Sequence, residues 1–249
     1  MIFKIFRVFI VLLISAFVWY GCSSSSESTR ETTKKIEVEP SKPTAKPNEE
    51  VEKELIKSQN IRSIDKISFD YDENGKLING EKLSTTNYSP DGLVKETLIF
   101  GKNSNIDNIY KYNYDKNNYR VQTIRYSADE KPDKKYTYEY NKYGNKIKSI
   151  RYDLNGTMEK YYTYNYDDMQ RLIEEDWYSA KGDLEYKIEY KYYNNGDKKS
   201  ATTFNQRDVM LYRYEYKYGA KGNVLEEEKY NEDDKSVGII QYVYKYFQK

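Results

Sequence analysis

Residues 162–187 read YTYNYDDMQRLIEEDWYSAKGDLEYK, and this stretch decides the fold. Tyr162, Tyr164 and Tyr166 are separated by the polar residues Thr163 and Asn165. Side chains two residues apart lie on the same face of a β-strand, whereas a helix repeats its apolar positions every three or four residues. The alternation therefore predicts a strand with one buried, tyrosine-rich face.

The same pattern recurs every 26 residues, without gaps, from about residue 84 onward. A fixed period of this length is typical of a repeat architecture. Four columns of equivalent positions carry the period: Thr86, Tyr112, Tyr138, Tyr164, Tyr190, Tyr216 and Tyr242; two residues later, Tyr88, Tyr114, Tyr140, Tyr166, Tyr192, Tyr218 and Tyr244; two residues earlier, Tyr110, Tyr136, Tyr162, Ile188, Tyr214 and Ile240; and, in a second strand, Phe100, Tyr126, Tyr152, Tyr178, Phe204 and Tyr230.

A turn follows each triplet and ends at Gly92, Asn118, Gly144, Gln170, Gly196 or Gly222. Glycine and asparagine tolerate the positive φ that tight turns require, so the turn that ends at Gln170 is expected to differ. A second strand and a second turn, clearest at 153–156 and 179–182, complete each repeat. The sequence thus predicts an all-β fold, an antiparallel meander of tandem 26-residue β-hairpin repeats.

The ends of the array depart from the period. An atypical first hairpin at 67–83 precedes the repeats, which start at 84, and an incomplete last repeat occupies 239–247. The total is about 15 strands, and so large a sheet normally curls through its twist. We expect a curved or spiralling sheet with the tyrosines on its concave face and an exposed edge at the C-terminal strand.

The second strand leaves one point open. An apolar column, Val121, Ile147, Ile173 and Leu225, precedes the aromatic column by five residues. Five is odd, so the two columns face opposite sides unless a bulge intervenes. Either both faces are partly covered or each second strand carries a bulge.

Composition excludes several classes of function. Tyrosine accounts for 30 of 249 residues and supplies most of the surface that the chain can bury. The 41 Lys and Arg residues are balanced by 40 Asp and Glu residues, so no basic surface for nucleic acid is expected. Histidine, the commonest general acid–base near neutral pH, does not occur, and the single cysteine cannot form an internal disulfide.

The first 60 residues predict export and attachment to a membrane. Lys4 and Arg7 precede an apolar run over 8–20, which indicates a signal peptide over 1–21. Gly21 and Cys22 at its end resemble the lipobox of bacterial lipoproteins, although Trp19 stands where leucine is usual. The resemblance implies that Cys22 is lipidated. Residues 22–60, rich in Ser, Thr, Glu, Lys and Pro, are predicted to be a disordered tether, with a short helix possible over 49–58.

The array over 61–249 resembles the YD repeats of RHS-type secreted and surface proteins, whose core pattern is Tyr-x-Tyr-Asp-x-x-Gly. The resemblance rests on 69–75 (FDYDENG), 112–115 (YNYD), 138–141 (YEYN) and 164–172 (YNYDDMQRL), with departures at Tyr193 and Gly219. It covers most of 67–246 and implies strands that wind into a β-sheet shell. No toxin or protease domain follows, so the encapsulation of a cargo is not implied.

The tyrosine ladder is the candidate ligand site, with Tyr112, Tyr138, Tyr164, Tyr190 and Tyr216 as contact residues. Aligned rings stack on sugars, but the same rings also serve as the core of a sheet. Acidic turns at 72–75 and 153–156 favour turn formation over a calcium site. Carboxylates at 167–168, 174–176 and 226–228 do not single out a glycosidase pair. We expect no catalytic residue, no metal and no cofactor.

The sequence therefore predicts an exported lipoprotein, anchored to a bacterial membrane through Cys22, with the outer membrane or the cell surface favoured. We expect a non-enzymatic binding or scaffold module at the cell envelope that contacts a protein or a glycan. The alternative is a structural envelope component that self-associates through its C-terminal edge strand.

Overall fold

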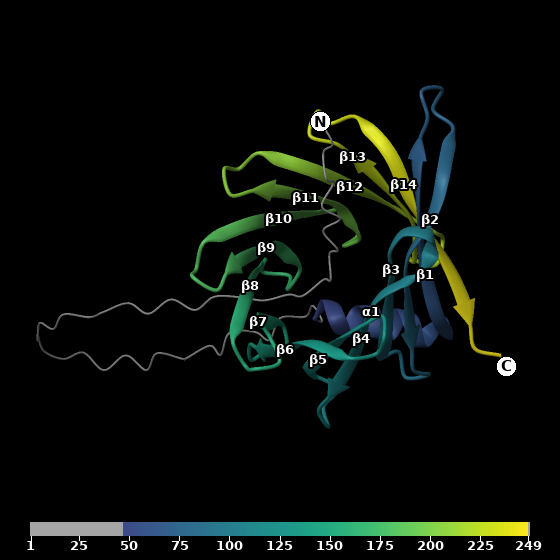
Figure 1. The fold of residues 1–249 in the computed structure, drawn as a ribbon. Coiled ribbons are helices and arrows are strands. Elements are labelled where there is room, and N and C mark those ends of the chain that lie inside the picture. The colour runs from purple at the N-terminus through teal and green to yellow at the C-terminus, as the bar shows by residue number, and fades with distance from the viewer. Residues whose placement is uncertain (1–46, 249) are drawn as a thin grey trace, which may run out of the picture.

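The computed structural model describes residues 47–248. Cys22, the signal peptide and residues 22–46 of the predicted tether lie outside the described residues. One helix precedes the strands, and a short 3-10 turn, η1, lies between β3 and β4 (Figure 1). The elements are α1 (Asn48–Ser58), β1 (Ile61–Tyr71), β2 (Leu77–Tyr88), β3 (Val94–Phe100), η1 (Lys102–Ser104), β4 (Ile106–Tyr114), β5 (Arg120–Ser127), β6 (Pro132–Tyr140), β7 (Lys146–Tyr152), β8 (Met158–Tyr166), β9 (Leu172–Ser179), β10 (Leu184–Tyr192), β11 (Lys198–Asn205), β12 (Met210–Tyr218), β13 (Val224–Tyr230) and β14 (Ser236–Tyr246).

The strands form one antiparallel meander, as predicted, but the meander closes into a barrel. Each strand pairs with its neighbours in sequence, and β14 also pairs with β1, with Ile64 opposite Tyr244 and Phe69 opposite Ile239. The expectation of a curved or spiralling sheet is therefore wrong, as is that of an exposed C-terminal edge. Twist curls the sheet far enough for its first and last strands to meet, and closure satisfies the backbone groups of both edges.

Each second strand of a repeat begins with a β-bulge, which settles the question of the odd spacing. Asn113 lies opposite Gln122 while Tyr114 lies opposite Arg120, so that Val121 is the extra residue. Arg120 consequently points into the lumen and Val121 points outward. The apolar and aromatic columns of the second strand share the outward face, and Val121 is 45% exposed.

The bulge recurs with the sequence period. Equivalent register shifts place Tyr88 opposite Val94, Tyr140 opposite Lys146, Tyr166 opposite Leu172, Tyr192 opposite Lys198 and Tyr218 opposite Val224.

Tyrosine hydroxyls join each hairpin to the one before it. The Tyr114 hydroxyl donates to the carbonyl oxygen of Val94 (2.9 Å), and the Tyr140 hydroxyl donates to that of Arg120 (2.8 Å). These carbonyls belong to bulge residues, where the regular ladder is interrupted. The bond recurs in later repeats, in each case to the residue 20 positions earlier: Tyr166 to Lys146, Tyr192 to Leu172, Tyr218 to Lys198 and Tyr244 to Val224.

A second row of hydroxyl bonds lies one layer deeper in the lumen. The Tyr138 hydroxyl bonds Thr123 Oγ1 (2.7 Å), and the Tyr164 hydroxyl bonds Ser149 Oγ (2.8 Å). The position equivalent to Ser149 is Ala201 in the repeat of Tyr216, and alanine offers no acceptor. The row is completed by Tyr112 to Thr97, Tyr190 to Glu175 and Tyr242 to Glu227.

The turn that ends at Gln170 does not differ from the others, contrary to expectation. Gln170 has φ of 62° and its amide donates to Asp167 O (2.9 Å), as the Gly144 amide does to Asn141 O (3.0 Å). The Asp167 side chain stabilises the turn by accepting from the amides of Met169 and Arg171 (3.0 and 2.8 Å). The local hydrogen bonds outweigh the cost of a positive φ at a residue with a Cβ.

The N-terminal boundary also differs from the expectation. The tether was predicted to run to residue 60, whereas Asn48–Ser58 form α1, which matches the short helix considered over 49–58. The first hairpin, predicted over 67–83, is longer, and its turn lies at 72–75. Within residues 47–248, no helix has the length and apolar character needed to cross a membrane.

The deeper hydroxyl row yields a prediction about stability. We expect Tyr164→Phe to lower the free energy of unfolding by about 1–3 kcal/mol, because it leaves the buried Ser149 hydroxyl without its partner. Tyr216→Phe is the matched control and should cost no more than about 0.5 kcal/mol, because position 201 is alanine. Urea unfolding followed by circular dichroism measures both variants. Equal losses would contradict the assigned role of the row.

Candidate functional site in the barrel lumen

The two faces of the wall differ in chemistry. Opposed residues share a face, so the pair Tyr164 and Glu175 faces the lumen and the pair Asn165 and Glu174 faces outward. The outward face is densely charged, and lipid-facing strands of membrane barrels carry an apolar band instead. Water is therefore the solvent that suits this outer wall. Charged outward positions on four strands are Glu174, Asp176, Lys187, Glu189, Lys191, Glu215, Lys217, Glu226 and Glu228.

The five tyrosines predicted to contact a ligand line the lumen. Tyr164 and Tyr190 are 1% and 5% exposed, and their rings pack in the core. Tyr112, Tyr138 and Tyr216 are partly buried and pack against that core. The structure therefore does not present them as an exposed concave row, and four of the five hydroxyls bond the wall. Their contact with a ligand stays a prediction.

One mouth of the barrel is covered by α1, and we call it the capped mouth (Figure 1). It is the end with the β2–β3, β6–β7 and β12–β13 turns. Ile56, 2% exposed, packs against Ile61 and Tyr88. At the end of the helix, Gln59 Nε2 donates to Lys221 O (3.0 Å) in the β12–β13 turn. The backbone of α1 approaches the β2–β3 turn so closely that a Cβ at Gly92 would lie 2.3 Å from Lys53 O.

Three cationic side chains lie inside the capped mouth at equivalent bulge positions. Arg120, Lys146 and Lys198 each follow an end-of-hairpin turn, and the bulge directs each side chain inward. Their charges lie over tyrosine rings: Arg120 Cζ is 4.5 Å from the Tyr112 ring centre, Lys146 Nζ is 4.9 Å from that of Tyr138, and Lys198 Nζ is 4.7 Å and 5.3 Å from those of Tyr190 and Tyr216. Ring faces attract cations and hold these groups in place.

Carboxylates from α1 meet these cations. Glu49 forms an ion pair with Lys146, whose side chain has no exposed surface. Burial raises the pKa of Glu49, but the charges of Lys146 and Arg120 outweigh it and hold that pKa below its usual value. Burial lowers the pKa of Lys146 to about 8, against the opposing charge of Glu49. The helix thus brings a negative charge to a desolvated ammonium group.

Glu52 lies one turn further along α1 and faces the same group of charges. Burial and the neighbouring Glu49 raise the pKa of Glu52, while Arg120, Lys198 and Lys66 act in the opposite direction. Burial also lowers the pKa of Lys198 to about 8. The capped mouth is therefore a cationic site to which α1 brings one paired carboxylate, that of Glu49, with the exposed Glu52 beside it.

Deeper in the lumen, Glu175 is a carboxyl group with no exposed surface. It accepts hydrogen bonds from Trp177 Nε1 (2.7 Å) and from the Tyr190 hydroxyl (3.1 Å). Burial raises its pKa to about 8, which outweighs these bonds and the charges of Lys146 and Lys198. The sequence did not distinguish Glu175 from its acidic neighbours. Comparison along the 26-residue period distinguishes Glu175, because its equivalents are Thr97, Thr123, Ser149 and Ala201, and a carboxyl group recurs at this position in Glu227.

The acidic turns serve the backbone. Asp72 Oδ1 accepts from the amides of Asn74 and Lys76 (2.9 and 2.8 Å), and Asp153 Oδ1 accepts from that of Thr157 (2.8 Å). These bonds are those expected of turn formation. Among residues 47–248, no group of three or more His, Cys, Asp or Glu side chains is placed to hold a metal ion.

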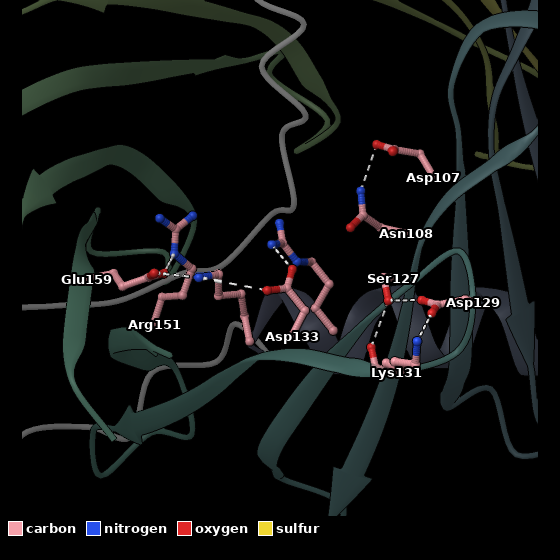
Figure 2. Close-up of polar contacts among 10 residues, drawn as sticks. Asp107, Asn108, Ser127, Asp129, Lys131, Asp133, Arg151 and Glu159 are labelled. Carbon is pink, nitrogen blue, oxygen red and sulfur yellow. Dashed lines mark hydrogen bonds and ion pairs between the residues drawn. The ribbon is translucent and has the colours of Figure 1, made fainter. Parts of the chain in front are cut away.

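Toward the opposite end of the barrel, ion pairs run from strand to strand (Figure 2). Arg125 pairs with Asp133, and Lys134 pairs with Glu159. Arg151 Nε lies 3.0 Å from Glu159 Oε2, so that Glu159 joins two strands. Lys160 extends the series to Glu185. Each of these four cations pairs with a carboxylate of the wall itself, and Glu159 serves two of them, whereas the carboxylate that pairs with Lys146 comes from α1.

Glu175 yields a prediction about pH. Its pKa is about 8 in the fold against 4.5 unfolded, so its contribution to stability is full below pH 4.5 and is lost as pH rises to about 8. The loss approaches about 1.4 kcal/mol per pH unit within that window. We expect Glu175→Gln to remove this decline, measured as the difference from the wild type in thermal unfolding between pH 5 and pH 8.

Glu174→Gln, on the outward face next to Glu175, is the control and should keep the decline. Above pH 8 the sign reverses, because Lys146 and Lys198 have lowered pKa values and shed an unfavourable buried charge. A Glu175→Gln profile that parallels the wild type from pH 5 to pH 8 would contradict the assignment.

Comparison with known proteins gives structural likeness without a family. No protein-family model and no curated protein matches the chain. A porin-like protein from Bacteroides uniformis ATCC 8492 matches 74% of this chain and 98% of its own length, with 11% identity and a TM-score of 0.43. A porin-like protein from Bacteroides vulgatus ATCC 8482 has the same coverage, 14% identity and a TM-score of 0.35. A TcdB2-TccC3 structure without its hypervariable C-terminal region matches 66% of this chain and 11% of its own length, with 13% identity and a TM-score of 0.26.

Proposed function

We propose that this protein is a non-enzymatic binding module, held at the cell envelope by a lipid on Cys22, that receives an acidic ligand at the capped mouth. Two features of the chain support the envelope location. The charged and apolar segments of residues 4–20 precede Gly21 and Cys22 in the order of a lipoprotein signal. The charged outer wall suits an aqueous compartment adjoining a membrane, with the anchor rather than the strands holding the protein there.

The observation that carries the proposal is the row of Arg120, Lys146 and Lys198. Desolvation of a cation is costly unless a partner compensates for it. On the outer face, Lys217 has two carboxylates from a neighbouring strand, Glu226 and Glu228. The ion-pair partner of Lys146 instead comes from α1, a segment outside the repeats. A site whose anionic partner is supplied from outside the wall is suited to binding a separate acidic group.

A binding role also fits the regularity of the wall better than catalysis does. Arg120, Lys146 and Lys198 stand at equivalent bulge positions of three repeats, so that the charges are spread around the mouth and do not form a single constellation. Cations spaced in this way match a ligand with several negative groups. Such a ligand would lie along the mouth and contact more than one hairpin.

The first test concerns the anchor. Cys22→Ser is expected to abolish both incorporation of labelled palmitate and partitioning of the full-length protein into the detergent phase, because it removes the acyl chains that hold the protein at a membrane. The control is Ser23→Ala, which should retain both. Label that persists in the Cys22→Ser variant would refute the proposed lipidation.

The second test concerns the ligand class. Poly-L-glutamate is expected to bind the full-length protein with an affinity that falls with salt, while poly-L-lysine should not bind. Lys198→Met should weaken that binding at least tenfold. Lys191→Met, which removes an outward lysine of the adjacent strand, is the control and should leave binding unchanged. Calorimetry at two salt concentrations gives the affinities, and equal affinity for the two Lys→Met variants would argue against the capped mouth as the site.

A further inference from the structure

Building on the proposed function, we infer that α1 is an autoinhibitory segment that occupies the ligand site at the capped mouth. An acidic amphipathic helix of a partner protein binds at this site when α1 dissociates from it. The helix α1 is attached to the barrel by an ion pair near its N-terminus and by a hydrogen bond at its C-terminus, and it covers the cations of the capped mouth.

The N-terminal half of α1 is attached through charge. Its ion pair joins Glu49 to Lys146, 97 residues further along the chain. Pro47 precedes the helix and gives no side-chain cap, and Val51 on the outer side is 52% exposed. An isolated helix of 11 residues is marginal in water, so α1 depends on its contacts with the barrel. Weakening the charge contact therefore weakens the helix as well.

The C-terminal end of α1 is joined to the barrel through Asn60, whose amide also donates to Lys57 O in the helix (3.1 Å). Asn60 has φ of 56° and separates the helix from β1. Its carbonyl accepts from the Phe247 amide (3.0 Å), and its Nδ2 donates to Phe247 O (3.1 Å). These bonds fix the start of β1 to the end of β14. Rotation of the helix before Asn60 breaks the Gln59–Lys221 hydrogen bond and the packing of Ile56, and it leaves the closure of the barrel intact.

The face that α1 turns to the lumen defines the chemistry of the partner. Glu49 and Glu52 are three residues apart and project from one side of the helix, followed on that side by Ile56. Glu49 forms an ion pair with Lys146, the exposed Glu52 adds a second negative charge near Arg120 and Lys198, and Ile56 packs against Ile61 and Tyr88. A helix with two acidic groups one turn apart and an apolar residue one further turn on would reproduce every one of these contacts.

The experiment measures whether opening α1 exposes the site. The probe is a labelled peptide with the sequence of residues 47–60, and the protein is the full-length chain. Val51→Pro breaks the helix at an exposed position, because it removes the hydrogen bond from the Val51 amide to Pro47 O while leaving the side-chain contacts of α1 with the barrel in place. We expect the peptide to bind the Val51→Pro variant at least tenfold more tightly than the wild type. Lys146→Met in the Val51→Pro background should reverse the gain, and a peptide with Gln in place of Glu49 and Glu52 should bind weakly to both.

A second variant protects the test against misfolding. Glu49→Lys places like charge against Lys146 and Arg120 and should open α1 without altering a strand. Near-ultraviolet circular dichroism of the tyrosines reports an intact barrel. Equal affinity of the wild type and of folded opened variants for the peptide would overturn the inference and leave the proposed function in place. Opened variants that bind neither the peptide nor poly-L-glutamate would overturn both.

Discussion

The hydrogen bond from a tyrosine hydroxyl to a bulge carbonyl is the interaction on which the rest of this barrel depends. The bulge leaves a carbonyl outside the regular ladder, and a buried carbonyl without a donor is costly. The tyrosine of the following hairpin supplies that donor, as Tyr140 does for Arg120 (2.8 Å). One residue type therefore fills the lumen with a ring, joins successive hairpins and permits the bulge. The abundance of tyrosine follows from these three roles.

The bulge also explains how charge enters the lumen. A strand without it would keep strict alternation, and the side chain of Arg120, Lys146 or Lys198 would point to the outer face. Because the bulge shifts the parity by one, this position faces inward in every repeat, and its identity varies: Val94, Leu172 and Val224 are apolar at the equivalent places. The wall thus tolerates either chemistry, and cations occupy three of the six equivalent positions. Buried cations at a mouth covered by an acidic helix are what distinguish a site from a scaffold.

The local features of the fold could be predicted from the sequence, and the long-range ones could not. Alternation around Tyr162, Tyr164 and Tyr166 predicts the strands, and the turn residues predict the meander. Closure depends on whether β1 reaches β14, which the accumulated twist of all the intervening strands decides.

The candidate site was beyond sequence reasoning for a related reason. The inward direction of Lys146 requires knowledge of the bulge, and its pairing with Glu49 spans 97 residues. The tyrosines were correctly placed on one face, and whether they form a core or an exposed row was left open because the closure of the sheet was not foreseen. Gln170 was expected to alter its turn, yet the hydrogen bonds of Asp167 preserve it.

The uniform bond between successive hairpins makes the circumference of this barrel a variable that evolution can change in steps. Each repeat bonds the bulge carbonyl of its predecessor in the same way, so a duplicated stretch of 26 residues would insert between two existing repeats with this bond available at both of its junctions. The ring would gain two strands and the lumen would widen by a fixed increment. The seam between β1 and β14, with its own register, would be unaffected. A helix as long as α1 would then no longer reach from the β6–β7 turn to the β12–β13 turn. The width of the barrel and the length of the helix that covers its mouth must therefore change together.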